Sequence, residues 1–104
     1  MKLYNTLSKS IEDLGPIREL KMFVCGPTVY DFIHIGNART FVIFDMIAKY
    51  LRHRGYQVNY IQNITDVDDK ILDRAMHAGE DPEEHAKKFE QEFKKDVKAL
   101  GITA

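Results

Sequence analysis

The pattern of apolar and polar positions divides the chain into strands and helices. Leu20 to Cys25 is a short apolar run that ends at Gly26-Pro27, which predicts a buried strand. From Asn37 to Arg54, apolar residues recur every three or four positions and are frequent enough to predict a helix buried on more than one side. Tyr56 to Ile61 predicts a second strand. A strand, a long helix and a strand form a βαβ unit, in which the two strands are parallel.

The segments on either side of this unit carry weaker patterns. Leu3 to Thr6 predicts a short edge strand, and residues 8–19 are mostly polar with a turn at Gly15-Pro16. After the second strand, a helix is expected from about Asp66 to Gly79. A further helix is expected over residues 81–100, because the sequence Asp-Pro-Glu-Glu supplies an N-cap and a first turn.

The composition is that of a small folded domain. Of the 104 residues, 44% are hydrophobic and 30% are charged, and the net charge of −1 argues against a module that coats nucleic acid. No apolar run approaches the roughly 20 residues that span a bilayer, and the first residues lack the apolar core of a signal peptide. We therefore expect a cytoplasmic protein without membrane contact. The expected fold is one α/β domain over residues 1–104, a parallel βαβ unit followed by helices, with no second domain.

The junction between the first strand and the long helix is the candidate site. Ligands of open α/β sheets bind beyond the carboxyl ends of the strands, and here that place is residues 25–37. The segment contains neither a Walker loop nor a Gly-x-Gly-x-x-Gly motif. Gly26 and Gly36 permit a ligand to approach the backbone, and His34 and Asn37 lie at a helix N-terminus, which suits a phosphate. A plainer interpretation makes His34 a turn residue and Asn37 an N-cap.

The residue types that bind metals show no ligand pattern by themselves. Cys25 is the only cysteine, so it cannot form an internal disulfide. It is open to three interpretations: a buried thiol, a metal ligand or a reactive thiol. Three histidines without ligand spacing are expected at the surface: His53, His77 and His85.

The segment after the second strand is rich in acids. Asp66, Asp68 and Asp69 favour stabilisation of a helix N-terminus over a Mg²⁺ or Ca²⁺ site. One interpretation of Thr65 makes it the N-cap of this helix, in a capping box closed by Asp68 or Asp69. It also lies at the carboxyl end of the second strand, so it is a candidate site residue as well.

Four segments of the sequence resemble one enzyme family. Residues 34–37, His-Ile-Gly-Asn, resemble the HIGH signature of class I aminoacyl-tRNA synthetases. Residues 25–31 resemble the end of the first strand in cysteinyl-tRNA synthetases, and residues 63–71 and 3–7 match the same family. Because the four segments occur in the family's order, the chain resembles the first part of that catalytic domain. The resemblance implies the first half of a Rossmann-like nucleotide-binding domain.

The resemblance also implies roles for single residues. His34 and Asn37 would be catalytic residues that contact the phosphates of ATP, which carries Mg²⁺, and Gly36 would let adenine pack against the backbone. Asn37 stands where histidine is commoner, and it can still donate a hydrogen bond to phosphate. Cys25 would be one ligand of a zinc ion that selects the thiolate of substrate cysteine. The other residues implied near the cysteine substrate are Gly26, Thr28, Tyr30 and Thr65.

Parts of that enzyme have no counterpart in this sequence. There is no KMSKS loop to clamp the triphosphate, and the family's other zinc ligands belong to the unmatched half of its catalytic domain. We therefore expect a cysteine–tRNA ligase, with cysteine and tRNA-Cys as its partners when complete, but no activity and no complete zinc site in these 104 residues alone.

Three interpretations of the shortened match stay open. The chain is a piece of a full synthetase, a non-catalytic relative that binds a nucleotide or a partner, or a cysteine ligase of mycothiol synthesis. The Thr-Val pair before Tyr30 favours the tRNA enzyme over the mycothiol enzyme. The open edges of a half-sheet are expected to favour self-association.

Overall fold

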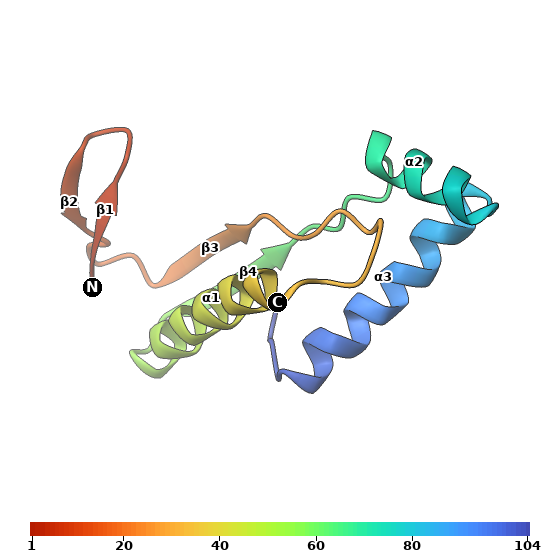
Figure 1. The fold of residues 1–104 in the computed structure, drawn as a ribbon. Coiled ribbons are helices and arrows are strands. Elements are labelled where there is room, and N and C mark those ends of the chain that lie inside the picture. Colours follow the sequence, from red (N-terminus) through yellow and green to blue (C-terminus); the bar gives the residue numbers. More distant parts are fainter.

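The computed structural model describes residues 1–104. Its elements, in chain order, are β1 (Lys2–Asn5), β2 (Ser10–Asp13), β3 (Glu19–Val24), α1 (Ile35–His53), β4 (Gln57–Gln62), α2 (Asp69–Ala78) and α3 (Pro82–Ala99). Figure 1 shows the β1–β2 hairpin at one end of the molecule and the α2–α3 pair at the other. The radius of gyration is 16.7 Å. A compact domain of this length would have a radius of about 13 Å, so the chain is elongated.

The central βαβ unit is present as predicted. β3 and β4 pair in parallel, in a register that sets Leu20 beside Val58. α1 packs on one face of the two strands, where Val24, Ala48 and Tyr60 form a buried cluster. The order of the elements and their parallel pairing are therefore confirmed, with boundaries that differ from the prediction by one or two residues.

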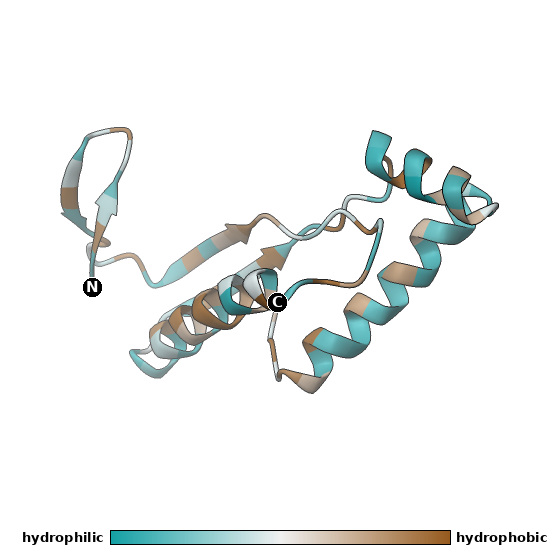
Figure 2. Cartoon of the chain, in the orientation of Figure 1, coloured by the Kyte–Doolittle hydropathy of each residue, from teal (hydrophilic) through white to brown (hydrophobic).

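The sequence predicted a buried first strand and a helix buried on more than one side, and this prediction is wrong, because the sheet face away from α1 is exposed. Phe23 and Ile61 are register partners on the face opposite to Val24, and they are 64% and 49% exposed. One helix packed on two strands covers only one face of each, so α1 buries a single stripe around Ala48. Figure 2 shows apolar residues along both β3 and α1. The apolar residues exposed on the rest of α1 include Val42, Ile43, Phe44 and Met46.

The β1–β2 hairpin is separate from the parallel sheet. The strand predicted at Leu3 to Thr6 is confirmed, within a residue, as β1. Its partner β2 lies inside residues 8–19, so the prediction of a polar connection there is wrong. The sequence of β2 is Ser-Ile-Glu-Asp, and a single apolar residue gives no alternation from which to predict a strand.

α2 and α3 form a pair of helices beyond the sheet. Asp81 caps α3 as predicted, and its carboxylate accepts hydrogen bonds from the backbone N–H groups of Glu83 and Glu84 at 3.1 and 3.2 Å. No helix of the chain combines the length and the apolar character needed to cross a membrane. A buried cluster holds the helix pair against the segment that follows β3: Val29, Ile71, Ala86 and Phe89.

The last residues of the chain return to α1. The buried carboxylate of Asp45 accepts hydrogen bonds from the backbone N–H and the hydroxyl of Thr103, both at 2.6 Å. Lys49 pairs with Asp45 at 2.6 Å and donates to the Gly101 carbonyl at 2.9 Å. Burial alone would raise the pKa of Asp45, but the hydrogen bonds from Lys49 and Thr103 outweigh it and lower the pKa below its usual value. We call this set of contacts the Asp45 clasp.

Candidate functional site

The carboxyl ends of β3 and β4 meet, and their pairing continues beyond both strands. The backbone N–H of Val29 donates to the Thr65 carbonyl at 3.1 Å, and the N–H of Thr65 donates to the Pro27 carbonyl at 3.0 Å. A parallel bridge therefore joins Thr28 and Thr65. These two predicted site residues, far apart in the sequence, lie side by side.

Gly26 is required by the protein's own backbone at this junction. Its N–H donates to the side-chain oxygen of Asn63 at 2.7 Å. A Cβ atom at position 26 would lie 1.7 Å from the Asn63 carbonyl oxygen, which no side chain can tolerate. The close approach of a ligand to Gly26 stays a prediction, whereas the contact that demands a glycine is made by Asn63. Asn63, which the sequence did not single out, also donates to the Thr65 hydroxyl at 3.4 Å.

His34 and Asn37 form a capping box at the start of α1. Nδ1 of His34 accepts a hydrogen bond from the Gly36 N–H at 3.0 Å, and Oδ1 of Asn37 accepts one from the His34 N–H at 3.2 Å. The plainer interpretation is wrong in detail, because His34 is the N-cap and Asn37 lies at the third helical position. The cap uses the acceptor atoms of both side chains. It leaves the Nε2–H of a neutral His34 and the amide NH₂ of Asn37 as donors beside a helix N-terminus.

A cavity of about 210 Å³ lies beside this helix start. Cys25, which follows β3, and His34, the N-cap of α1, are not part of its lining. Ligand pockets usually measure about 300–1,000 Å³, so the cavity suits part of a ligand rather than a whole nucleotide. Four predicted site residues are part of its lining: Gly26, Thr28, Tyr30 and Asn37.

Cys25 follows β3 directly, and its side chain is exposed rather than buried. Its thiol lies 3.8 Å from the Gly26 carbonyl oxygen and has no other polar contact. The chain contains no group of three or more His, Cys, Asp or Glu side chains that could hold a metal ion. A zinc site takes at least three protein ligands, so one thiolate does not fit zinc within these 104 residues. The interpretation of Cys25 as a buried thiol is also wrong.

The helix after β4 begins later than predicted and has a different cap. Asp68 is the N-cap of α2, and its carboxylate accepts a hydrogen bond from the Lys70 N–H at 2.9 Å. The predicted capping box headed by Thr65 is therefore wrong, because Thr65 is still paired with the segment after β3. Asp69 lies in the first turn of α2, as expected for an acid that stabilises a helix N-terminus.

Two basic side chains of α2 cover the ring of Tyr30. Lys70 Nζ lies 5.4 Å and Arg74 Cζ lies 5.7 Å from the ring centroid, within the range of cation–π attraction. Arg74 also pairs with Asp31 at 3.2 Å. The sequence interpretation missed both residues. Their spacing of four places them on one helix face, and that spacing was the available signal for a shared target.

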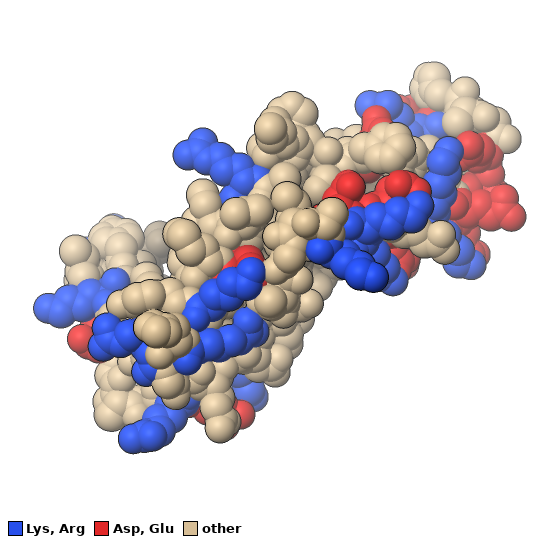
Figure 3. Space-filling model, turned by 90° about the horizontal axis from the view of Figure 1, so that it is seen from below, with Lys and Arg blue, Asp and Glu red and all other residues tan.

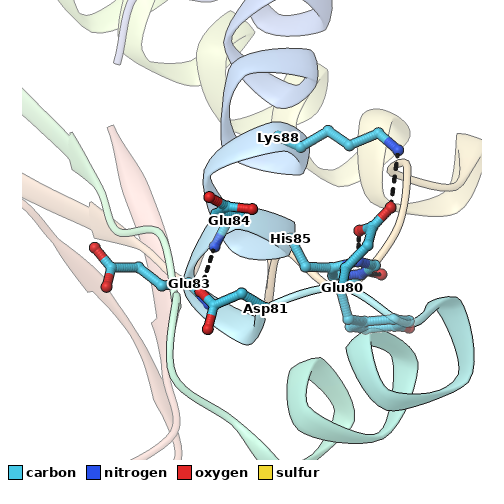
Figure 4. Close-up of polar contacts among 7 residues, drawn as sticks. Glu80, Asp81, Glu83, Glu84, His85 and Lys88 are labelled. Atoms are coloured by element: carbon cyan, nitrogen blue, oxygen red, sulfur yellow. Dashed lines mark hydrogen bonds and ion pairs between the residues drawn. The ribbon is translucent and has the colours of Figure 1, made fainter.

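His85 corrects the prediction that this residue lies at the surface. It is only 5% exposed, whereas His53 and His77 are exposed as predicted. Nδ1 of His85 lies 2.8 Å from the carboxylate of Glu80, and Nε2 lies 2.8 Å from the backbone carbonyl of Tyr30. Figure 4 shows the His85 ring beside Glu80 at the start of α3.

The position of His85 on α3 explains its burial. It precedes Phe89 by four residues, so it continues the apolar stripe predicted for this helix, and its ring packs 4.8 Å from that of Phe89. The stripe was thus the signal that could have predicted a buried histidine. The hydrogen bond from His85 lowers the pKa of Glu80 below its usual value.

Acidic side chains gather at the α2–α3 end of the molecule, as Figure 3 shows. A groove of about 400 Å³ lies between these helices, and its lining includes Asp66, Asp68, Glu83 and Glu90, with Lys87 as the one basic residue. This charge repels a phosphate. The groove is larger than the cavity beside Asn37. The start of α1 is the better candidate for an anion, because its first turn contains no acidic residue and the one acid of the neighbouring cavity, Asp31, is paired with Arg74.

The parallel βαβ unit, with its His-Ile-Gly-Asn cap at the carboxyl ends of the strands, is compatible with part of the α/β catalytic domain of a class I synthetase. Residues 12–104 match the model of the tRNA synthetases class I (C) catalytic domain, and the chain belongs to that family. It is 53% identical to the cysteine–tRNA ligase of Thermococcus kodakarensis and 55% identical to that of Clostridioides difficile, over 98% of this chain. The resemblance and the fold class predicted from the sequence are confirmed.

The match covers a limited part of these relatives. The chain spans 22% of the length of each of the two ligases, or about a fifth. The activity and the substrates of the whole enzyme are therefore considered below as proposals.

Proposed function

We propose that this chain supplies the ATP- and cysteine-binding junction of a cysteine–tRNA ligase. In the complete ligase, the carboxylate of cysteine would attack the α-phosphate of ATP, release pyrophosphate and form cysteinyl-adenylate, from which the cysteinyl group passes to tRNA-Cys. The observation that carries the proposal is the capping box of His34 and Asn37, which leaves two donors at the start of α1. The names of the relatives support the same activity. A cytoplasmic location goes with a role in protein synthesis.

The start of α1 would bind the nucleotide. The Nε2–H of His34 and the amide NH₂ of Asn37 would donate to phosphate oxygens, whose charge the helix N-terminus also stabilises. Both side chains are already fixed by the cap, so these donors are oriented before the nucleotide arrives. Gly36 would let adenine approach the backbone, and Mg²⁺ would enter with the ATP.

The strand ends would bind the amino acid. Gly26, Thr28 and Tyr30 line the 210 Å³ cavity, whose size suits an amino acid, and Thr65 pairs directly with Thr28. Zinc plays no part in the proposal for the 104 residues, because Cys25 is a single ligand. In the complete ligase, Cys25 would supply one of the ligands of a zinc ion that binds the substrate thiolate, as the resemblance implies.

The activity is tested by cysteine-dependent exchange of pyrophosphate into ATP. The pure chain should show negligible exchange, since it has no KMSKS loop to hold the triphosphate. Adding the remaining part of the Clostridioides difficile ligase, the 55% identical relative, should restore exchange. His34→Ala should abolish the restored exchange, whereas His53→Ala, at an exposed histidine near the other end of α1, should not. Robust exchange by the chain alone, or equal rates for the two variants, would contradict the proposal.

Nucleotide binding is tested separately on the chain itself. Addition of MgATP should shift the backbone amide signals of residues 34–37. A non-catalytic interaction domain would show no such shifts. If exchange is restored, tRNA-Cys should accept the activated cysteine, whereas transfer to an amino sugar instead would identify a ligase of mycothiol synthesis.

A further inference from the structure

Two helices hold the segment that leads from β3 into α1. From α2, Arg74 pairs with Asp31 and lies over the ring of Tyr30. From α3, the ring of Phe89 meets that of Phe32 edge to face at 5.1 Å, and His85 reaches the Tyr30 carbonyl. Residues 30–32 are thus held from the α2–α3 side, immediately before the signature that begins at residue 34.

The partners of His85 define its protonation state. The Tyr30 carbonyl can only accept a hydrogen bond, so Nε2 of His85 must carry a proton. The Glu80 carboxylate also accepts, so Nδ1 must carry a proton too. A neutral imidazole has one N–H group. Its unprotonated nitrogen would face either the carboxylate or the carbonyl with a lone pair, and no hydrogen bond could form there. The two contacts, each 2.8 Å long, therefore require the charged imidazolium.

We propose that His85 is a positioning residue whose imidazolium ties the α2–α3 junction, through Glu80, to the Tyr30 carbonyl and so fixes the segment that enters the signature helix. This role goes beyond the proposed ligase activity and does not depend on it. Loss of one ring proton would break one of the two contacts and loosen residues 30–33, which the Phe32–Phe89 contact would still join to α3. A cavity of about 290 Å³ adjoins His85 and the segment and gives it room to move.

The charged groups around His85 come from three parts of the chain. Glu80 at the junction is the direct partner, and Lys88 of α3 lies 3.8 Å from its other carboxylate oxygen. Arg74 and His77 of α2 and Asp31 of the segment line the adjoining cavity. Of these, Glu80 alone bonds the ring, so its carboxylate is the group expected to keep both ring protons in place.

The first test observes the ring directly. In the 104-residue chain labelled with ¹⁵N, both ring nitrogens of His85 should carry directly bonded protons at pH 6. Glu80→Gln, at a side chain that is 37% exposed and so tolerant of exchange, should remove the proton from Nδ1. A neutral His85 ring in the unmodified chain would overturn the proposal, and so would a ring unaffected by Glu80→Gln.

The second test measures the segment. Hydrogen exchange of the backbone amides of residues 31–34 should become about tenfold faster or more in His85→Ala, since a charged hydrogen bond contributes about 1.5–3 kcal/mol. Glu80→Gln should accelerate the same amides by a smaller factor and without unfolding the helix pair, because a neutral ring protonated at Nε2 still donates to the Tyr30 carbonyl. His77→Gln, which removes an exposed imidazole from the same helix pair, should leave them unchanged.

Where along the chain hydrogen exchange becomes faster shows whether His85 positions this one segment or supports the fold as a whole. Acceleration should be confined to residues 30–34 and should not extend to β4 or the middle of α1. Acceleration spread evenly over the chain, or none in either variant, would overturn the proposal. Failure of MgATP to shift residues 34–37 would count against the ligase proposal alone, because neither measurement on His85 involves nucleotide.

Discussion

The tightest contact between single residues is the one between Gly26 and Asn63. We predict that Gly26→Ala destabilises the fold by about 1–3 kcal/mol or more, because a Cβ atom would lie 1.7 Å from the Asn63 carbonyl oxygen and would force the strand ends apart. The matched control is Gly36→Ala, where the nearest atom is His34 Nδ1 at 3.3 Å and the helical backbone accepts alanine. Urea unfolding of both variants measures the difference. Equal stability of the two would show that the strand ends are not packed as described.

A second residue-scale prediction concerns the Asp45 clasp. Asp45 is 4% exposed, so Asp45→Asn, which loses the charge opposite Lys49, should lower the free energy of unfolding at pH 7 by about 1–3 kcal/mol. The pKa of Asp45 is lowered in the folded chain. The stability that the Asp45 carboxylate contributes is therefore fully present above the unfolded pKa of about 3.9, and it disappears as the pH falls through the lower folded-state pKa.

The pH dependence supplies the check on this prediction. Below about pH 5, the unmodified chain should lose more stability than Asp45→Asn, and the two should converge only once the pH is below the folded-state pKa of Asp45. Asp66→Asn, at an exposed aspartate outside the clasp, should follow the unmodified chain at every pH. Parallel curves for the unmodified chain and Asp45→Asn would mean that the clasp carboxylate contributes nothing.

At the scale of elements, the start of α1 combines a structural and a chemical role that can be separated. Asn37→Asp keeps the oxygen that accepts from the His34 N–H, so the helix should stay capped. It replaces the NH₂ donor with a negative charge, so MgATP should no longer shift the amides of residues 34–37. Asn37→Ala should instead cost about 0.5–1.5 kcal/mol of stability through loss of the hydrogen bond from the His34 N–H. Circular dichroism and the nucleotide titration together distinguish the two variants, and unchanged ATP binding by Asn37→Asp would exclude the amide as a phosphate donor.

Elements in which the spacing of apolar residues repeats over a long stretch could be predicted from the sequence. Elements that are short, or whose pattern is mixed, could not. α1 and α3 carry apolar stripes over several turns, so their positions were predicted to within two residues, as were β3 and β4 between them. β2 was missed because its four residues include one apolar side chain, which cannot show the alternation of apolar and polar residues typical of a strand. α2 was predicted to start too early because Thr65 and Asp68 are both good N-caps, and the choice is made by strand pairing that no local pattern records.

The candidate site shows the same limit. Thr65 lies beside Thr28, as expected because the ends of neighbouring parallel strands must meet. The contacts of Lys70, Arg74 and His85 with the signature segment were not predicted, because they depend on how the α2–α3 pair folds back on the segment after β3. Such long-range packing is set by the whole chain.

At the scale of the whole molecule, the chain is elongated and has little core. Only 14 of its 104 residues are buried, and its principal dimensions are 53 × 30 × 21 Å. The core is divided into two small clusters, one around Ala48 and one around Ile71. Since burial of apolar surface is the main source of stability, uncovered apolar surface on the sheet and on α1 is available for further association.

This surface leads to the prediction of self-association. Phe23 and Ile61 form an exposed apolar pair on the sheet face without a helix, and each strand of the two-stranded sheet has one edge unpaired. The sedimentation coefficient of the chain should therefore rise with its concentration. Burial of a phenylalanine side chain contributes about 1.5–3 kcal/mol, so Phe23→Ser should weaken association by about tenfold or more. Leu7→Ser, at a leucine that is 93% exposed on the separate hairpin, is the matched control and should leave association unchanged. A chain that stays monomeric at all concentrations, or two variants that behave alike, would rule out the uncovered sheet face as the contact.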